Sequence, residues 1–365
     1  MNRRKLVRNA GLGAVAATGL AAPALAQGLP EIKWRLTSSF PKSLDTIFGA
    51  GEHFARRVAQ LTENRFQIRV FAGGEIVPAL QALDAVQNGT VECCHTAPYY
   101  YVGKDPTFAF DTAVPFGLNT RQHNAWIYHG GGLELMREFY KDYNVTSYLL
   151  SHTGAQMGGW YRKEIKTPDD LKGLKMRIGG FAGQVLAKLG VIAQQIAGGD
   201  IYPALEKGVI DAAEWVGPYD DQKLGFNKVA PYYYYPGWWE GGAALSLFVN
   251  LKAIEALPDT YRYAIETAAG ETVSWSVAKY DAQNPRALRE LVASGTKLSP
   301  FPAVVMEACF AAAQQLYAET AAANPRFKKV HDHYMAFRRE QVLWFRVAEG
   351  TFDNFMARQS AADRL

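Results

Sequence analysis

Hydrophobic and polar positions change their spacing repeatedly between residues 32 and 98, and these changes predict alternating strands and helices. Alternating or continuous apolar runs predict strands at 32–40, 65–73 and 90–98. An apolar stripe with helical spacing begins at Leu44, and Pro78 and Gly89 bound a second helix. The β-α-β-α-β order predicts a parallel sheet with helices on its faces.

A second unit of the same kind occupies residues 174–216. Its predicted elements are strands at 174–180, 191–197 and 209–216, with helices at 181–190 and 200–208. A strand at 145–150 crosses between the two units, a strand at 243–250 returns to the first, and a long helix follows at 257–284. The pattern therefore predicts two α/β lobes.

The stretches 82–98 and 202–218 share one plan, in which a helix, a glycine, a strand and a proline follow one another. Alignment on the shared glycine matches His95 with Glu214. A chance match over so short a span is the alternative. Because open α/β sheets bind ligands beyond the carboxyl ends of their strands, we expect both strand ends to face a cleft between the lobes.

The C-terminal segment 330–355 has a separate apolar stripe, with aromatic residues at spacings of three and four. This spacing predicts one long amphipathic helix. The stripe follows the completed lobes, so packing on its own body and clasping a second copy are both open interpretations.

The N-terminus has a charged start, a short apolar run and an Ala-x-Ala ending, which predict a secretory signal over residues 1–26. The Arg3–Arg4 pair suggests twin-arginine export, with an ordinary secretory signal as the alternative. No cysteine lies near the cleavage point, so we expect no lipid anchor. The chain has 39 Lys and Arg against 35 Asp and Glu, and the signal holds the excess, so nothing indicates nucleic-acid binding.

Arg177 and Glu214 are the polar side chains that the apolar strand patterns leave unexplained. Arginine is rarely buried alone, and its planar fork suits a carboxylate, so Arg177 predicts either a ligand anchor or an internal salt bridge. Glu214 is compatible with a general base, a metal ligand or an arginine partner. A carboxylate ligand on Arg177 would be repelled by Glu214, and a bound cation removes that conflict.

Oxygen donors for such a cation are available near Glu214. The amide oxygen of Gln156 and the backbone carbonyl of Trp215 are candidates, because hard cations prefer oxygen ligands. Aromatic residues at 99–101, 232–235 and 238–239 favour a lined pocket, although clusters of this kind also fill cores. The stretch Ser151–Thr153 lacks the strained elbow of a catalytic serine.

Three motifs together resemble the extracytoplasmic solute receptors of TRAP transporters: "TPDDLKGLKMRI" (167–178), "ALEKGVIDAAEW" (204–215) and "FVNLKAIEALPDTYR" (248–262). The resemblance covers nearly the whole chain after the signal. It implies that Arg177, which matches the family's arginine in place and type, binds a substrate carboxylate.

Within that family the chain is most similar to the α-keto-acid branch. The resemblance implies a cation, typically sodium, held with a small 2-oxo acid by Gln156, Glu214 and Trp215. The stretch 155–159 lacks the additional arginine of sialic-acid receptors, which puts sugar acids in doubt. The branch also has a long C-terminal helix that is linked with dimers, so the resemblance favours the second-copy interpretation of the C-terminal stripe.

We therefore expect an α/β fold of the type II periplasmic binding protein kind, with a ligand cleft between two lobes and a long C-terminal helix. The expected segments are lobe I at 27–150 and 241–281, lobe II at 151–240 and 282–325, and a dimerisation helix and tail at 326–365. The expected substrate-binding residues are Arg177, Gln156, Glu214, Trp215, Tyr99, Tyr100 and Phe40. The expected ligands of Na⁺, with Ca²⁺ possible instead, are Gln156, Glu214, Trp215 and Glu240.

The expected function is capture of pyruvate, 2-oxobutyrate or a longer α-keto acid in the periplasm for delivery to TRAP permease membrane subunits. We expect a homodimer and no enzymatic activity. Two alternatives stay open at this point: a periplasmic cofactor-dependent enzyme acting on keto or hydroxy acids, and a ligand-sensing subunit.

Overall fold

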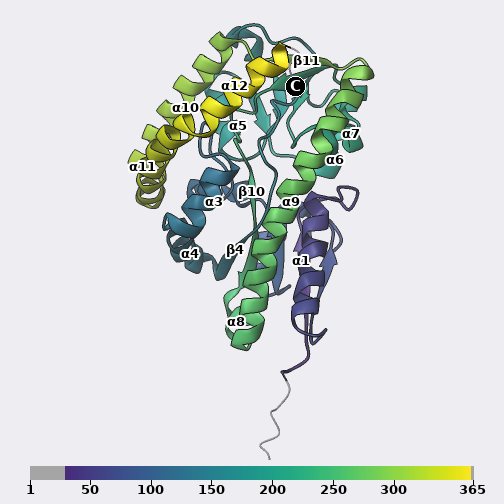
Figure 1. Cartoon of the computed structure of the whole chain (residues 1–365), viewed down its shortest axis with the longest axis vertical. Coiled ribbons are helices and arrows are strands. Elements are labelled where there is room, and N and C mark those ends of the chain that lie inside the picture. The colour runs from purple at the N-terminus through teal and green to yellow at the C-terminus, as the bar shows by residue number, and fades with distance from the viewer. Residues whose placement is uncertain (1–28, 363–365) are drawn as a thin grey trace, which may run out of the picture. The chain divides into compact units, whose positions relative to one another are not determined.

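Residues 29–362 are described by the structure, a computed structural model shown in Figure 1, and the signal expected over 1–26 lies outside them. The described chain contains two sheets. The first has the spatial order β2 (Phe66–Phe71), β1 (Ile32–Ser38), β3 (Cys93–Thr96), β10 (Ala244–Asn250) and β4 (Val145–His152). The second has the order β11 (Lys297–Pro300), β9 (Tyr232–Tyr235), β5 (Trp160–Tyr161), β8 (Ala212–Ala213), β6 (Lys175–Arg177) and β7 (Ile192–Gln194).

The predicted alternation of strands and helices is confirmed in both units. The helices are α1 (Ile47–Leu61), α2 (Ala82–Gln87), α3 (Thr120–His129), α4 (Gly132–Tyr140), α5 (Gly180–Lys188), α6 (Gly198–Glu206), α7 (Pro218–Leu224), α8 (Leu251–Glu255), α9 (Asp259–Ala293), α10 (Ala303–Ala323), α11 (Pro325–Val347) and α12 (Glu349–Ala361). Helix α9 is longer than expected and contacts both α1 and α7 along its length (Figure 1).

The similarity between 82–98 and 202–218 is structural as well as sequential. β3 runs parallel to β1 in the first sheet, and β8 runs parallel to β6 in the second. The Glu92 carboxylate accepts a bond from the backbone N–H of Arg35 at 2.7 Å. The matching Asp211 carboxylate accepts one from the backbone N–H of Lys175 at 3.1 Å. The shared side-chain bond argues against a chance match.

The returning strand expected at 243–250 is confirmed as β10. It runs antiparallel between β3 and β4, so it inserts into the first sheet rather than the second. The strand expected at 145–150 is its neighbour, β4. No helix within 29–362 is both long enough and apolar enough to cross a membrane.

Two elements depart clearly from the extents that the sequence predicts. The strand expected over 209–216 is only two residues long as β8, because the following backbone turns away to bond elsewhere. The single helix expected over 330–355 divides at Ala348 into α11 and α12. Gly350, a poor helix former, lies just after the division, and Glu349 at the start of α12 forms an ion pair with Arg121.

Candidate functional site

Arg177 and Glu214 lie side by side at the carboxyl ends of adjacent parallel strands. Arg177 ends β6, and Glu214 directly follows β8. Both are buried, with exposed side-chain fractions of 1 % and 0 %. Arg177 Nη1 donates to the Glu214 backbone carbonyl at 2.9 Å and to Glu214 Oε1. The internal salt bridge that the sequence left open is therefore present.

The ion pair leaves one group of each partner free. Arg177 Nε donates to the Ile196 carbonyl at 3.1 Å, whereas Arg177 Nη2 has no hydrogen-bond partner. Glu214 Oε1 also accepts from Gly179 N at 2.9 Å, whereas Glu214 Oε2 has no partner. Because unpaired buried polar groups are costly, these two atoms are candidates for ligand contacts.

Gln156 and Glu240 bring two more unpaired oxygens to the same site. The Gln156 N–H donates to the Glu240 carbonyl at 3.2 Å, and Gln156 Nε2 donates to Thr153 Oγ1 at 3.3 Å. Gln156 Oε1 and Glu240 Oε2 have no partner. Burial, together with the nearby Glu214 charge, raises the pKa of Glu240 well above its ordinary value. Burial raises the pKa of Glu214 above its ordinary value, although the Arg177 charge opposes this rise.

These unpaired oxygen atoms fit a hard cation. Gln156, Glu214 and Glu240 each present one unpaired, buried oxygen, which is the ligand type that Na⁺ and Ca²⁺ take. Within 29–362, no three His, Cys, Asp or Glu side chains form a metal-binding group. A cation here would therefore need amide or backbone oxygens beside the two carboxylates.

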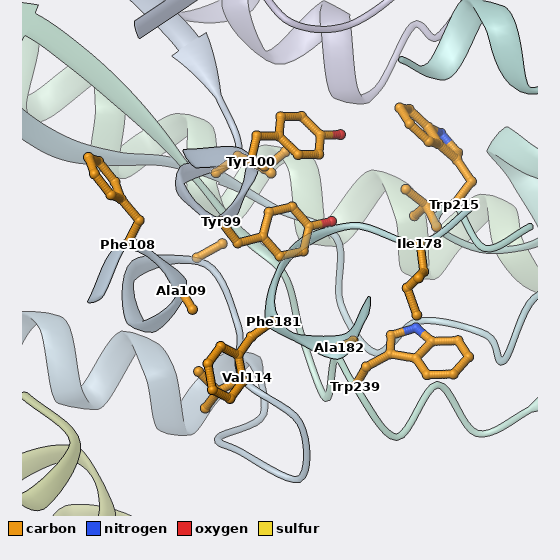
Figure 2. Close-up of a cluster of buried hydrophobic side chains, with 14 of the residues drawn as sticks. Tyr99, Tyr100, Phe108, Ala109, Val114, Ile178, Phe181, Ala182, Trp215 and Trp239 are labelled. Atoms are coloured by element: carbon orange, nitrogen blue, oxygen red, sulfur yellow. The ribbon is translucent and has the colours of Figure 1, made fainter. Parts of the chain in front are cut away.

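Aromatic side chains line the adjoining small cavity. Its lining includes Phe40, Tyr99, Tyr100, Thr153, Gln156 and Trp215. The Arg177 guanidinium lies 5.0 Å from the Trp215 ring centroid, and the ring centroids of Tyr99 and Tyr100 are 5.2 Å apart. Figure 2 shows the hydroxyl ends of both tyrosines directed toward the side on which Trp215 lies.

Glycines allow the closest approaches between these elements. Gly180 has φ +65°, and a Cβ there would lie 2.2 Å from the Tyr99 ring. A Cβ at Gly198 would lie 2.4 Å from the Trp215 ring. Any larger residue at either position would displace an aromatic wall of the cavity.

All eight residues expected at the site are buried, and ring contacts, hydrogen bonds or shared electrostatic interactions connect them. Sequence reasoning missed Thr153 and Gly179, although the Gly179–Gly180 pair, which begins two residues after Arg177, was a usable signal. Other members of the aromatic stretches fill the core, the alternative that the sequence left open. Tyr101 bonds to Thr96 of β3 at 3.0 Å, and Tyr233 stacks on Trp160 with centroids 3.9 Å apart.

The sequence profile of bacterial extracellular solute-binding proteins, family 7, matches residues 37–324. The chain belongs to this family. The resemblance to TRAP receptors stated from the motifs is thereby confirmed. A monocarboxylate 2-oxoacid-binding periplasmic protein of Nostoc sp. is 50 % identical over 361 residues, which cover 97 % of this chain and 99 % of the relative.

Two solved structures of TRAP solute-binding proteins share the fold closely. The protein from Bordetella bronchiseptica is 56 % identical, with a TM-score of 0.91 over 92 % of this chain and 99 % of that one. It is described as a mixed-occupancy dimer with copurified calcium and picolinate in its occupied site. The protein from Pseudoalteromonas atlantica, with bound sodium and pyruvate, is 38 % identical, with a TM-score of 0.86 over 89 % and 99 %.

Proposed function

We propose that the chain is the periplasmic receptor of a TRAP transporter and that it captures a small 2-oxo monocarboxylate together with a cation. The observation that carries the proposal is the set of unpaired, buried atoms in one place: Arg177 Nη2 beside the oxygens of Gln156, Glu214 and Glu240. One donor faces an anion, and three acceptors face a cation. The Nostoc relative is a 2-oxoacid-binding protein, and the Bordetella structure holds calcium and picolinate. Both support the same assignment.

Arg177 anchors the ligand carboxylate in this proposal. Two of its nitrogens are committed to Glu214 and Ile196, so Nη2 alone is available for the ligand. The Trp215 ring below the guanidinium and the buried walls around it exclude water, which strengthens the charge-assisted bond.

The cation balances charge in the closed site. When ionised, Glu214 and Glu240 exceed the single charge of Arg177, and a bound carboxylate adds a further negative charge. Gln156 Oε1, Glu214 Oε2 and Glu240 Oε2 would hold the cation, with the Trp215 carbonyl as a further ligand. Sodium is our proposed ion and calcium the alternative, because the related structures hold one or the other.

The lining of the cavity supports an enclosed ligand with an apolar part. Tyr99, Tyr100, Trp215 and Phe40 line it, and all four are buried. We propose that lobe I (27–150 and 241–281) and lobe II (151–240 and 282–325) close on the ligand, with the aromatic residues as its walls.

Thermal melting with pyruvate tests the ligand assignment. We expect a raised melting temperature in sodium buffer and a much smaller rise in sodium-free buffer, because the cation completes the site. Acetate, which lacks the oxo group, is the ligand control. Arg177→Ala is expected to abolish the shift, whereas Arg137→Ala, which removes an arginine bonded to the Ser147 carbonyl elsewhere, keeps it. Equal shifts in Arg177→Ala and wild type would contradict the assigned anchor.

We propose a receptor role without catalysis. Periplasmic delivery to a permease requires the ligand to leave unchanged. Incubation of the protein with pyruvate and sodium should therefore leave the ligand's proton NMR spectrum unchanged, and mass measurement of the native protein should show no organic cofactor. Turnover of pyruvate, or a tightly held cofactor, would favour the enzyme alternative.

We also propose a homodimer formed through residues 326–365. The first part of α11 packs on α3, α4 and α10 (Figure 1), and Tyr334 is buried there. The end of α11 and α12 instead expose large apolar side chains, with Leu343 63 %, Val347 64 % and Phe352 65 % exposed. Contiguous exposed apolar residues of this kind mark interfaces.

Light scattering after size-exclusion chromatography tests this oligomeric state. The wild type is expected at twice the chain mass, and the double variant Val347→Glu/Phe352→Glu at the chain mass, because charges in an apolar interface oppose association. Tyr263→Glu, at an equally exposed aromatic on α9, is the matched control and should leave the mass unchanged. A monomeric wild type would contradict the proposal.

A further inference from the structure

Glu214 and Trp215, two of the proposed binding residues, lie directly after β8 and belong to no strand. β8 ends at Ala213, so the backbone from 214 to 217 lacks the regular bonds of a sheet. Five hydrogen bonds to separate partners hold this backbone instead. Glu214 N donates to the Arg177 carbonyl at 3.1 Å, and the Glu214 carbonyl accepts from Arg177 Nη1 at 2.9 Å. The Val216 carbonyl accepts from Met157 N at 3.0 Å, and the Gly217 carbonyl accepts from Asp221 N at 2.9 Å. The fifth bond, and the one that uses a carboxylate, runs from Val216 N to Asp221 Oδ1 at 3.2 Å.

Asp221 connects this segment to the second sheet. Its other oxygen, Oδ2, accepts from Trp160 Nε1 at 3.0 Å and from the Tyr233 hydroxyl at 2.7 Å. Trp160 lies in β5 and Tyr233 in β9, and their rings stack on each other. One carboxylate therefore joins α7, two strands and the binding segment.

The burial of Asp221 indicates a role other than stabilising the core. Its side chain is buried, and burial raises its pKa to about 6, although the three donors oppose this rise. A well-packed apolar residue usually serves a core as well as a buried charge does. Asp221 instead supplies the acceptor that Val216 would have found in a neighbouring strand.

We propose that Asp221 is a positioning residue, which fixes the backbone of Trp215 and Val216 and so holds Glu214 and the Trp215 carbonyl in the geometry that the cation requires. The inference rests on the proposed function for its cation, but the positioning itself is a property of the protein alone. Residues that orient metal ligands typically change metal affinity roughly 10–100-fold when substituted.

Asp220 provides a matched control in the same helix. It is equally buried and accepts a bond from the Tyr280 hydroxyl at 2.7 Å, but it has no bond to the segment 214–217. Asp220→Asn and Asp221→Asn thus make the same chemical change one residue apart. Only the second removes an acceptor from the binding segment.

Asparagine at position 221 creates a specific conflict. Val216 N–H and Trp160 Nε1–H can only donate, and the amide has a single carbonyl oxygen for both. In the double variant Asp221→Asn/Trp160→Phe the competing donor is gone, and the carbonyl can face Val216. We therefore expect this variant to recover part of the loss, relative to Trp160→Phe alone.

The experiment combines amide hydrogen exchange of the ligand-free protein with pyruvate titrations at varied sodium concentration and constant ionic strength. We expect Asp221→Asn to raise exchange in the segment 214–217 and to raise the half-saturating sodium concentration roughly 10–100-fold. Asp220→Asn is expected to change neither, and the double variant to move both readouts back toward the wild type.

Four other results would each decide against a part of the proposal. Unchanged exchange at 214–217 in Asp221→Asn, or an equal sodium shift in Asp220→Asn, would overturn the positioning role. Absence of pyruvate binding by the wild type, with exchange raised only in Asp221→Asn, would overturn the proposed function and support the positioning role. If Asp221→Asn does not fold, Tyr233→Phe removes one anchor of Asp221; an unchanged sodium requirement in that variant would also overturn the proposal.

Discussion

Substitution of Arg177 by lysine separates ligand binding from stability. The guanidinium has five N–H donors. Nε serves the Ile196 carbonyl, and the two Nη1 hydrogens serve the carbonyl and the carboxylate of Glu214. The two Nη2 hydrogens are left for the ligand. Lysine keeps the positive charge but has only three donors, which equals the number that the protein itself uses.

The magnitude follows from this count. If the ammonium satisfies Glu214 and Ile196, the ligand loses a charge-assisted bond worth about 1.5–3 kcal/mol. That loss corresponds to roughly a 10–150-fold increase in the dissociation constant for pyruvate. Arg177→Met removes the charge as well, leaves Glu214 buried without its partner, and is expected to lower the free energy of unfolding by about 3–5 kcal/mol. Lysine should cost less, because the ion pair persists.

Two assays check the prediction. Calorimetric titration with pyruvate at fixed sodium gives the dissociation constant, and urea unfolding without ligand gives the stability. The double variant Arg177→Met/Glu214→Gln removes both charges and should be more stable than Arg177→Met. Affinity in Arg177→Lys within about twofold of wild type would refute the donor count, and wild-type stability in Arg177→Met would refute the importance of the buried pair.

Three further predictions follow from the same structure. Glu240→Gln is expected to weaken the dependence of the melting temperature on sodium, because the amide cannot ionise to give the cation a charged oxygen; an unaltered sodium titration would contradict this. Gly180→Ala is expected to weaken pyruvate binding at least about tenfold by displacing Tyr99, and unchanged calorimetric affinity would show that the ring has room. Burial raises the pKa of Asp111 to about 6, so its contribution lowers stability as pH rises from about 4 to about 6; Asp111→Asn should flatten urea-unfolding stability over that window, and a slope equal to wild type would contradict the shift.

The local order of elements could be predicted because each element carries its own signal. The apolar stripe of α1 and the Pro78 and Gly89 bounds of the second helix region are properties of neighbouring residues. The length of β8 could not be predicted. Its apolar run continues to Val216, but the Glu214 carbonyl accepts from Arg177 Nη1 and Val216 N donates to Asp221 Oδ1, so side chains outside that run take the place of strand pairing.

The site was partly accessible for the same reason. Arg177 and Glu214 were visible as charges in apolar strands, and burial of both is what that pattern indicates. Their salt bridge and the free Nη2 depend on the register of β6 against β8, which places Arg177 opposite Ala213. No local pattern encodes that register.

The sequence by itself determined the two similar α/β units, the charged residues at their strand ends and the apolar C-terminal stripe, because these follow from spacing along the chain. Only the tertiary structure decided which atoms stay unpaired: Arg177 Nη2 and the oxygens of Gln156, Glu214 and Glu240. Hydrogen bonds between segments far apart in the chain consume the other donors and acceptors. The donor and acceptor atoms that those bonds leave unpaired are the ones available to a ligand.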